Sequence, residues 1–310
     1  MSASQPVSDL VRVRAPGKVN LALRVGAVRE DGYHPLATVF QALSIFDELS
    51  ATNAAPGEYR IRVQGDQAHL VPEDGTNLAV KAARLLAARN GGVDRHGVDL
   101  TIRKTIPVTG GMAGGSADAA AALVACANLW AIDINPAELQ DLGAELGADV
   151  PFCLLGSTAL GHGRGDDLVP VLSRGGYHWV LALPDVELST PAVFRRFDEM
   201  NPDADPPPPS VPAGLLEGLA SGDVQRVAEN LVNDLEPAAI SLRPDLADLL
   251  DAGREAGALA GMVSGSGPTC AFLAGNEDAA VRLSGALSSL GLCRAVRRAS
   301  GPVPGARQVA

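Results

Sequence analysis

The hydrophobic pattern alternates between strand-like and helix-like segments along the whole chain. Period-two alternation and short apolar runs predict strands at residues 11–13, 20–25, 60–63, 98–102, 179–183, 270–273 and 295–298. Apolar residues at helical spacing, and one alanine-dense run, predict helices at residues 78–89, 117–130, 136–146, 223–235, 245–256 and 277–290. This mixture predicts an α+β protein.

Segments rich in glycine and proline separate these elements. Residues 15–18 (Ala-Pro-Gly-Lys) are typical of a turn between two strands, which would place Lys18 at a bend. Residues 107–116 and 261–267 are glycine-rich and predict loops. The proline-rich residues 201–212 predict a flexible surface loop, because proline fits the interior of neither a helix nor a sheet.

The length of the chain favours two domains. A single core tends to stop growing at about 250 to 300 residues, and this chain has 310. Glycines near residues 165–176 suggest a boundary there, so we expect an N-terminal domain over residues 1–170 and a C-terminal domain over residues 171–310. A single domain is the alternative.

Charge and cysteine usage narrow the class of protein. The net charge of −11 argues against nucleic acid or an anionic membrane as the main partner, because both would repel the chain. No run of about 18 apolar residues predicts a membrane span, and residues 1–10 lack the features of a signal peptide. We expect a cytoplasmic protein with neither a zinc site nor a disulfide framework, since the four cysteines are far apart: Cys126, Cys153, Cys270 and Cys293.

The strongest local signal for chemistry is the glycine-rich segment 107–116. Four glycines in six residues allow the backbone to approach a ligand closely, and a helix is predicted directly after them. Free amides at a helix N-terminus bind phosphate, so an acidic protein can hold a polyphosphate without many basic side chains. The segment lacks the Gly-Lys-Ser/Thr end of a Walker A loop and the spacing of a dinucleotide fingerprint. On its own it is also compatible with a plain turn before a helix.

Further short blocks flank this loop in a recognisable order. They are Pro16-Gly17-Lys18-Val19-Asn20, Asp31-Gly32-Tyr33-His34, Leu146-Gly147-Ala148-Asp149-Val150-Pro151 and Ser264-Gly265-Ser266-Gly267. Together they resemble the GHMP kinase superfamily over almost the whole chain. The Gly-Tyr-His and Gly-Ala-Asp-Val-Pro segments resemble more narrowly the kinases of the non-mevalonate isoprenoid pathway. The resemblance implies a two-domain α+β architecture with the active site in the interdomain cleft, and ATP-dependent phosphorylation of the 2-hydroxyl of a cytidine diphosphate-linked polyol.

The resemblance implies a catalytic pair, Lys18 and Asp149. Asp149 matches the aspartate that accepts the proton of the acceptor hydroxyl, and Lys18 matches the lysine that stabilises the charged groups around it. Phosphoryl transfer needs a group that accepts the hydroxyl proton and a group that stabilises negative charge, and a carboxylate and an ammonium can fill these two roles. Without the resemblance, Asp149 is more often a helix cap or a surface residue, and Lys18 a solvated turn lysine.

The resemblance also implies binding of ATP with Mg²⁺. The residues that match the phosphate-binding loop are Pro107, Val108, Thr109, Gly110, Gly111, Met112, Ala113, Gly114, Gly115, Ser116 and Ala117. Ser116 is a candidate ligand for phosphate or metal, since Mg²⁺ bridges phosphate oxygens in this chemistry. Asn77 and Lys104 match positions near the nucleotide, but they are equally compatible with a helix cap and an exposed charge at a strand end.

Five residues match positions that hold the cytidine and diphosphate of the acceptor, or lie beside them: Asn20, Tyr33, His34, Thr190 and Phe194. Aromatic rings stack on pyrimidines, and histidine offers hydrogen bonds to a base. On their own, Tyr33 and Phe194 are more often core or rim residues, and His34 is more often a polar residue satisfied inside the protein.

Departures from the pattern and two alternative functions stay open at this stage. Met112 replaces the usual leucine, and Ala117 and Asp118 stand where many relatives have serine and asparagine, so that Asp118 adds negative charge near the phosphates. Another GHMP kinase, of the homoserine or mevalonate type, would use the same loop with a different acceptor pocket. A non-catalytic nucleotide sensor would need the loop but neither Lys18 nor Asp149.

Overall fold

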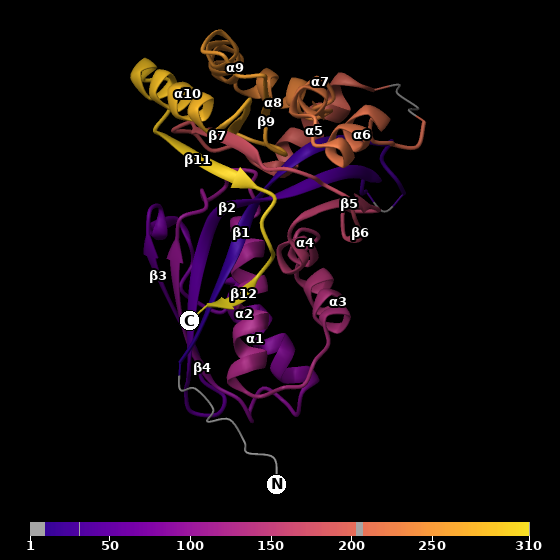
Figure 1. Cartoon of the computed structure of the whole chain (residues 1–310). Coiled ribbons are helices and arrows are strands. Elements are labelled where there is room, and N and C mark those ends of the chain that lie inside the picture. Colours follow the sequence, from indigo (N-terminus) through magenta and orange to yellow (C-terminus); the bar gives the residue numbers. More distant parts are fainter. Residues whose placement is uncertain (1–9, 31, 203–206, 310) are drawn as a thin grey trace.

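The computed structural model describes residues 10–30, 32–202 and 207–309. Asp31, residues 1–9 and residues 203–206 of the predicted proline-rich loop lie outside this range. Figure 1 shows two parts, each built around its own sheet. The strands are β1 (Leu10–Val25), β2 (Leu36–Asn53), β3 (Tyr59–Gly65), β4 (Val98–Lys104), β5 (Thr158–His162), β6 (Asp167–Pro170), β7 (Tyr177–Leu183), β8 (Val232–Asn233), β9 (Ala260–Val263), β10 (Cys270–Ala274), β11 (Ala295–Gly301) and β12 (Arg307–Val309).

The helices cover both sheets. They are α1 (Leu78–Arg89), α2 (Gly114–Leu129), α3 (Pro136–Leu146), α4 (Val150–Leu155), α5 (Thr190–Met200), α6 (Ala213–Ser221), α7 (Val224–Glu229), α8 (Glu236–Leu242), α9 (Asp245–Glu255) and α10 (Glu277–Leu290), with a 3₁₀ turn, η1 (Ala68–Leu70). None of the described helices combines the length and the apolar character that a membrane span requires.

The first sheet is organised by the long antiparallel pair of β1 and β2, which runs from Leu10 opposite Thr52 to Val25 opposite Leu36. The order of strands is β12-β1-β2-β4-β3, and β5 with β6 extends β2. The C-terminal strand β12 pairs with β1, and β8 lies parallel to it. Figure 1 shows the end of the chain returning from β11 to this sheet. The boundary at residue 170 therefore stays a prediction, since later segments contribute to the first sheet as well.

The second sheet, in the order β11-β7-β10-β9, is antiparallel, and its central strands β7 and β10 are buried on both faces. Side chains alternate across a strand, so β7 sends Trp179 and Leu181 into the core shared with the first part and Val180 into a second core. The second core includes α9 and α10, and Leu23 and Val25 at the end of β1 reach it. Strand β1 therefore joins the two cores.

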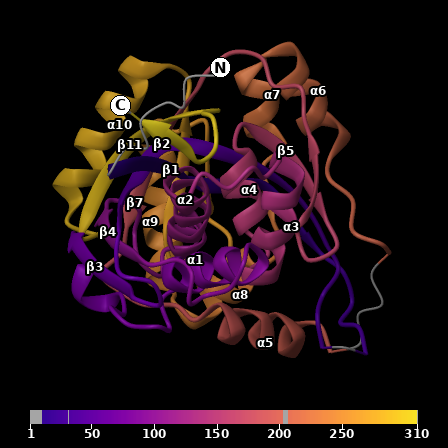
Figure 2. The same ribbon diagram turned by 90° about the horizontal axis from the view of Figure 1, so that it is seen from below.

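Helix α2 lies in the middle of the first part, with α1, α3 and α4 around it (Figure 2). Its alanines are almost all buried, because small side chains let the helix approach β1 and β2 closely. Helix α3 has a reciprocal capping box between Asn135 and Glu138, which explains why its start could be predicted from sequence.

Most predicted elements are confirmed, with three corrections. Residues 15–18 are not a turn: they continue β1, and Pro16 and Gly17 are accommodated by a shift of register against β2. The helix predicted at residues 223–235 ends at Glu229, because Asn233 turns inward and donates to the carbonyl oxygens of Val263 and Gly265 at 2.8 Å. The helix predicted at residues 117–130 begins earlier, at Gly114.

The contact between α9 and β10 generates a stability prediction. A Cβ added to Gly253 would lie 2.0 Å from the ring of the buried Phe272. We expect Gly253→Ala to lower the free energy of unfolding by about 1–3 kcal/mol, since the core must shift to admit the methyl group. Gly285→Ala in α10 is the matched control, because nothing lies within 4 Å of its added Cβ. It should stabilise by about 0.5–1 kcal/mol. Urea unfolding of both variants tests this; equal stabilities would contradict it.

Candidate active site

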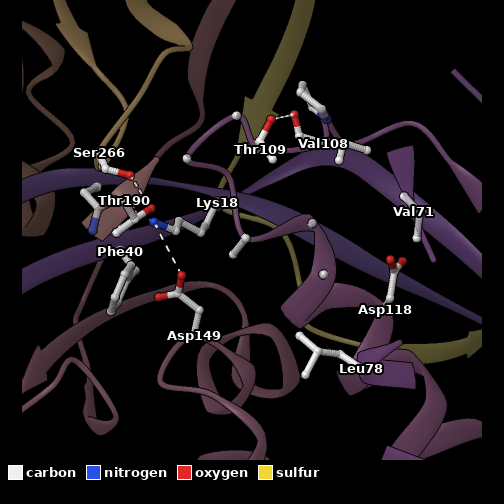
Figure 3. Close-up of a pocket in the computed structure, with 18 of the residues that line it drawn as sticks. Lys18, Phe40, Val71, Leu78, Val108, Thr109, Asp118, Asp149, Thr190 and Ser266 are labelled. Atoms are coloured by element: carbon white, nitrogen blue, oxygen red, sulfur yellow. Dashed lines mark hydrogen bonds and ion pairs between the residues drawn. The ribbon is translucent and has the colours of Figure 1, made fainter. Parts of the chain in front are cut away.

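A cavity of about 490 Å³ lies between the two parts of the molecule. Its walls come from β1, β2, the start of α1, the glycine-rich loop before α2, the start of α4, α5 and the turn after β9. Segments far apart in the sequence therefore meet at this one place. Figure 3 draws 18 of the lining residues and labels ten of them.

The two glycine-rich segments pack directly against each other at the wall of this cavity. A Cβ on Gly111 would lie 2.1 Å from the carbonyl oxygen of Ser264, and Gly111 has a φ of 72°, so only glycine fits there. Thr109 and Ala113 are also left-handed, with φ of 54° and 60°. Left-handed residues between right-handed ones turn successive amides toward one side, which is the geometry of an anion-binding nest.

The loop leads directly into the N-terminus of α2 at Gly114. The first amides of a helix have no partner within it and carry a partial positive charge, so they attract phosphate. Most of the predicted loop lines the cavity: Pro107, Val108, Thr109, Gly110, Gly111, Ala113, Gly114 and Gly115. Met112 is buried in the core, and neither Ser116 nor Ala117 is among the lining residues.

Lys18 and Asp149 meet in the same cavity, with Lys18 beside the two glycine-rich segments. Lys18 Nζ lies 3.8 Å from Asp149 Oδ2, with the lysine buried and the aspartate one-third exposed (Figure 3). Asp149 stands at the N-cap position of α4, yet its side chain makes no capping hydrogen bond. The carboxylate therefore faces Lys18 instead of its own helix.

A chain of hydrogen bonds orients Lys18. Its ammonium donates to Asn20 Oδ1, the Asn20 amide donates to Thr38 Oγ1, and Thr38 donates to the carbonyl of Ala22, at 2.8, 2.8 and 2.7 Å. Thr38 is fully buried. The Lys18 ammonium can only donate, so the side-chain oxygen of Asn20 must face Lys18 and its NH₂ group must face Thr38. Asn20 thus positions Lys18 as well as lining the cavity.

Lys104 and Asn77 also line the cavity, but both bind other parts of the protein. Asn77 caps α1 by accepting from the amide of Ala79. Lys104 is buried between Asp47 and Asp118, and it contacts Asp118 Oδ2 at 2.7 Å. Burial alone would lower the pKa of Lys104, but the charges of the two carboxylates raise it.

The predicted acceptor residues fall into two groups. Asn20, Thr190 and Phe194 line the cavity, and the hydroxyls of Thr190 and Ser266 lie 2.7 Å apart (Figure 3). His34 lies behind Phe194, with the two rings stacked at 5.4 Å, and it lines a neighbouring cavity instead. The side chain of Tyr33 is 58% exposed and is not among the residues that line either cavity.

Sequence reasoning missed several residues around the site. Thr38 and Asp47 lie in β2, a strand that the pattern did not predict, and Ser266 was noticed only as part of a glycine-rich block. No side-chain signal marks Thr38 before β1 and β2 are paired. No group of three or more His, Cys, Asp or Glu that could hold a metal ion occurs among the described residues.

Comparison with known proteins decides the family. The family model described as "GHMP kinases N terminal domain" matches residues 77–157, and "GHMP kinases C terminal" matches residues 215–291. A curated relative, 4-diphosphocytidyl-2-C-methyl-D-erythritol kinase of Rhodococcus jostii (strain RHA1), is 56% identical over 96% of this chain and 94% of its own length. The chain is a GHMP kinase. It is accordingly an ATP-dependent small-molecule kinase.

Solved structures agree with this assignment. The crystal structure of a 4-(cytidine 5'-diphospho)-2C-methyl-D-erythritol kinase superposes with a TM-score of 0.74 at 34% identity, covering 93% of this chain and 98% of that one. A homoserine kinase from Cytophaga hutchinsonii ATCC 33406 has a TM-score of 0.77 at 20% identity over the full length of both chains, which shows a shared fold alone. The two-domain GHMP architecture predicted from the sequence is confirmed.

The hydrogen-bond chain behind Lys18 generates a prediction for this kinase. Thr38→Val keeps the shape of the side chain but removes the hydroxyl that holds Asn20, so Lys18 loses its fixed position. We expect kcat to fall about tenfold, while KM for ATP stays within about twofold. Thr158→Val is the matched control, since Thr158 is also buried but is absent from the cavity lining. Equal kcat values for the two variants would refute a positioning role for Thr38.

Proposed function

We propose that this kinase transfers the γ-phosphoryl group of ATP to the 2-hydroxyl of 4-diphosphocytidyl-2-C-methyl-D-erythritol, giving the 2-phosphate and ADP. The reaction would belong to the non-mevalonate route to isoprenoid precursors and take place in the cytoplasm. The observation that carries the proposal is that the Lys18–Asp149 pair and the glycine-rich loop line one cavity. Full-length similarity to kinases of that name supports the choice of acceptor.

The proposed chemistry divides the cavity into two ends. ATP would lie with its phosphates on the loop and the N-terminus of α2, and Asn77 would lie near the nucleotide. Asp149 would accept the proton of the attacking hydroxyl, while Lys18 stabilises the negative charge that develops on the oxygens. The 3.8 Å between these two groups exceeds a hydrogen bond, so each keeps donors or acceptors for the substrate. The chain supplies positioning and charge, with no covalent intermediate.

Mg²⁺ is part of the proposal because it bridges phosphate oxygens in phosphoryl transfer and usually takes only one or two protein ligands. The absence of a metal cluster among the described residues fits an ion held mainly by the nucleotide. Ser116, half-buried in the first turn of α2, is the proposed protein ligand.

The acceptor would be held by Asn20, Thr190 and Phe194, with its cytidine end toward Tyr33 and His34. Phe194 offers an aromatic face to a pyrimidine, and His34 already stacks on that side chain. Both ring nitrogens of His34 face oxygens, Gly26 O at 2.8 Å and Asp198 Oδ1 at 3.2 Å. Reading a base with the His34 ring would therefore require one of these contacts to give way.

The acceptor assay tests the proposal directly. Purified protein with ATP and Mg²⁺ should release ADP with the diphosphocytidyl-methylerythritol acceptor and not with homoserine or mevalonate, the acceptors of other kinases in this fold. Chelation of Mg²⁺ should stop the reaction and its return should restore it. Turnover with homoserine or mevalonate alone would refute the acceptor pocket, and ATP binding without any turnover would favour a nucleotide sensor.

Replacement of the proposed base is a separate prediction. Asp149→Asn should lower kcat by about a hundredfold or more and leave the affinity for ATP nearly unchanged, because the change removes only the proton acceptor. Its Tm should fall only slightly: no helix cap is lost, but the buried Lys18 ammonium loses the charge of a partly exposed partner. Single-turnover kinetics and nucleotide titration provide the measurements. A kcat near the wild-type value would mean that positioning alone activates the hydroxyl.

A further inference from the structure

A buried cluster of three charged residues lies beneath the glycine-rich loop. It consists of Lys104 at the end of β4, Asp47 in β2 and Asp118 in α2, with exposed fractions of 3%, 1% and 3%. One ammonium is shared by two carboxylates. Desolvating three charges is costly, so their retention in the core calls for a structural or functional reason.

The cluster ties together the two ends of the loop. Asp47 Oδ1 accepts hydrogen bonds from the amides of Thr105 at 2.6 Å and Ile106 at 2.9 Å, immediately before the loop. Lys104 donates to Asp118 and, at 3.3 Å, to the carbonyl of Gly114, where the loop ends and α2 begins. The distance between the ends of the loop is therefore set by three side chains that lie outside it.

The contacts of Lys104 leave its ammonium no donor for a ligand. Asp47, Asp118 and the carbonyl of Gly114 use all three donors of the Lys104 ammonium. Asp47 is not among the residues that line the cavity. Any effect of Asp47 on nucleotide binding must therefore pass through its partners, the loop amides and Lys104. In Figure 3, Asp118 lies on the side of the cavity lined by Val71 and Leu78, away from Asp149.

We infer that Asp47, Lys104 and Asp118 are positioning residues that hold the phosphate-binding loop in the shape that ATP requires. The inference rests on the proposed role of the loop. A loop held in its bound shape loses less conformational freedom on binding, and this increases affinity without a new contact. Lys104, which also lines the cavity, then supports the nucleotide site by holding the loop.

Asp118 has a distinctive environment within the cluster. Burial raises the pKa of Asp118 well above its usual range and Asp47 adds to this effect, although the charge of Lys104 opposes it. Its Oδ1 atom has no hydrogen-bond partner among the described residues. An asparagine keeps an oxygen acceptor for Lys104 without a second negative charge, so Asp118→Asn preserves the connection. Asp118→Ala removes it.

The test is calorimetric titration of the full chain with ATP, together with KM for ATP and for the acceptor. We expect Asp47→Ala and Asp118→Ala to raise the Kd of ATP about tenfold, and KM of the acceptor to stay within about twofold. Asp118→Asn should bind ATP within about threefold of the wild type. If Asp47→Ala does not fold, Asp47→Asn supplies the same measurement, since its amide would oppose the Lys104 donors.

Leu249→Ala is the control for general destabilisation, because Leu249 is buried in the second core, away from the loop. It should lower Tm and leave the Kd of ATP unchanged. Wild-type ATP affinity in the Asp47 variants would overturn the inference, and so would losses of affinity that follow Tm in all variants alike. Because ATP binding is measured without acceptor, the result stands even if the acceptor assay refutes the proposed function.

Discussion

The pairing of β1 with β2 is the constraint on which the rest of the structure depends. The register shifts between Pro16 and Gly17 and again between Asn20 and Ala22, so the stretch from Gly17 to Asn20 is set off within one strand. Lys18 and Asn20 are two residues apart and therefore share a face. The Lys18 amide donates to the carbonyl of Met112 at 3.2 Å, which attaches the glycine-rich loop to the same stretch. One strand thus positions an ammonium, its orienting amide and the phosphate-binding loop together.

The alanine-rich character of α2 follows from its place against this strand pair. Small side chains let the helix approach the sheet closely, and the approach brings its N-terminal amides to the wall of the cavity. The same packing buries Ala117 and Asp118 near the start of the helix. Any charge there must be paired, as Asp118 is with Lys104. The close approach of α2 to β1 and β2 therefore accounts both for its small side chains and for the pairing of Asp118 with Lys104.

The features that could be predicted from the sequence are those set by neighbouring residues, such as helix caps and glycine-rich loops. Helix α1 has its asparagine cap and α3 its capping box, and four glycines in six residues mark the loop before α2. Strand β2 was missed because its first half is buried without alternation, and because the charged Asp47 takes a buried position in the half that does alternate. Thr38 and Asp47 belong to that strand, and their partners lie 16 and 57 residues away in sequence. Resemblance to a family supplied Lys18 and Asp149; only long-range pairing shows what holds Lys18 in position.

Asp149 illustrates how the local sequence leaves a side chain available for chemistry. An aspartate at an N-cap ordinarily accepts a hydrogen bond from the first turn of its helix, but here the side chain makes none. Pro151 occupies that first turn and has no N–H, so the helix presents one donor fewer to the carboxylate. Helix α4 has only 6 residues, and burial of Val150 and Phe152 stabilises it in place of a cap. The Asp-Val-Pro segment therefore begins a helix that does not use the Asp149 side chain as a cap, and the carboxylate can face Lys18 instead.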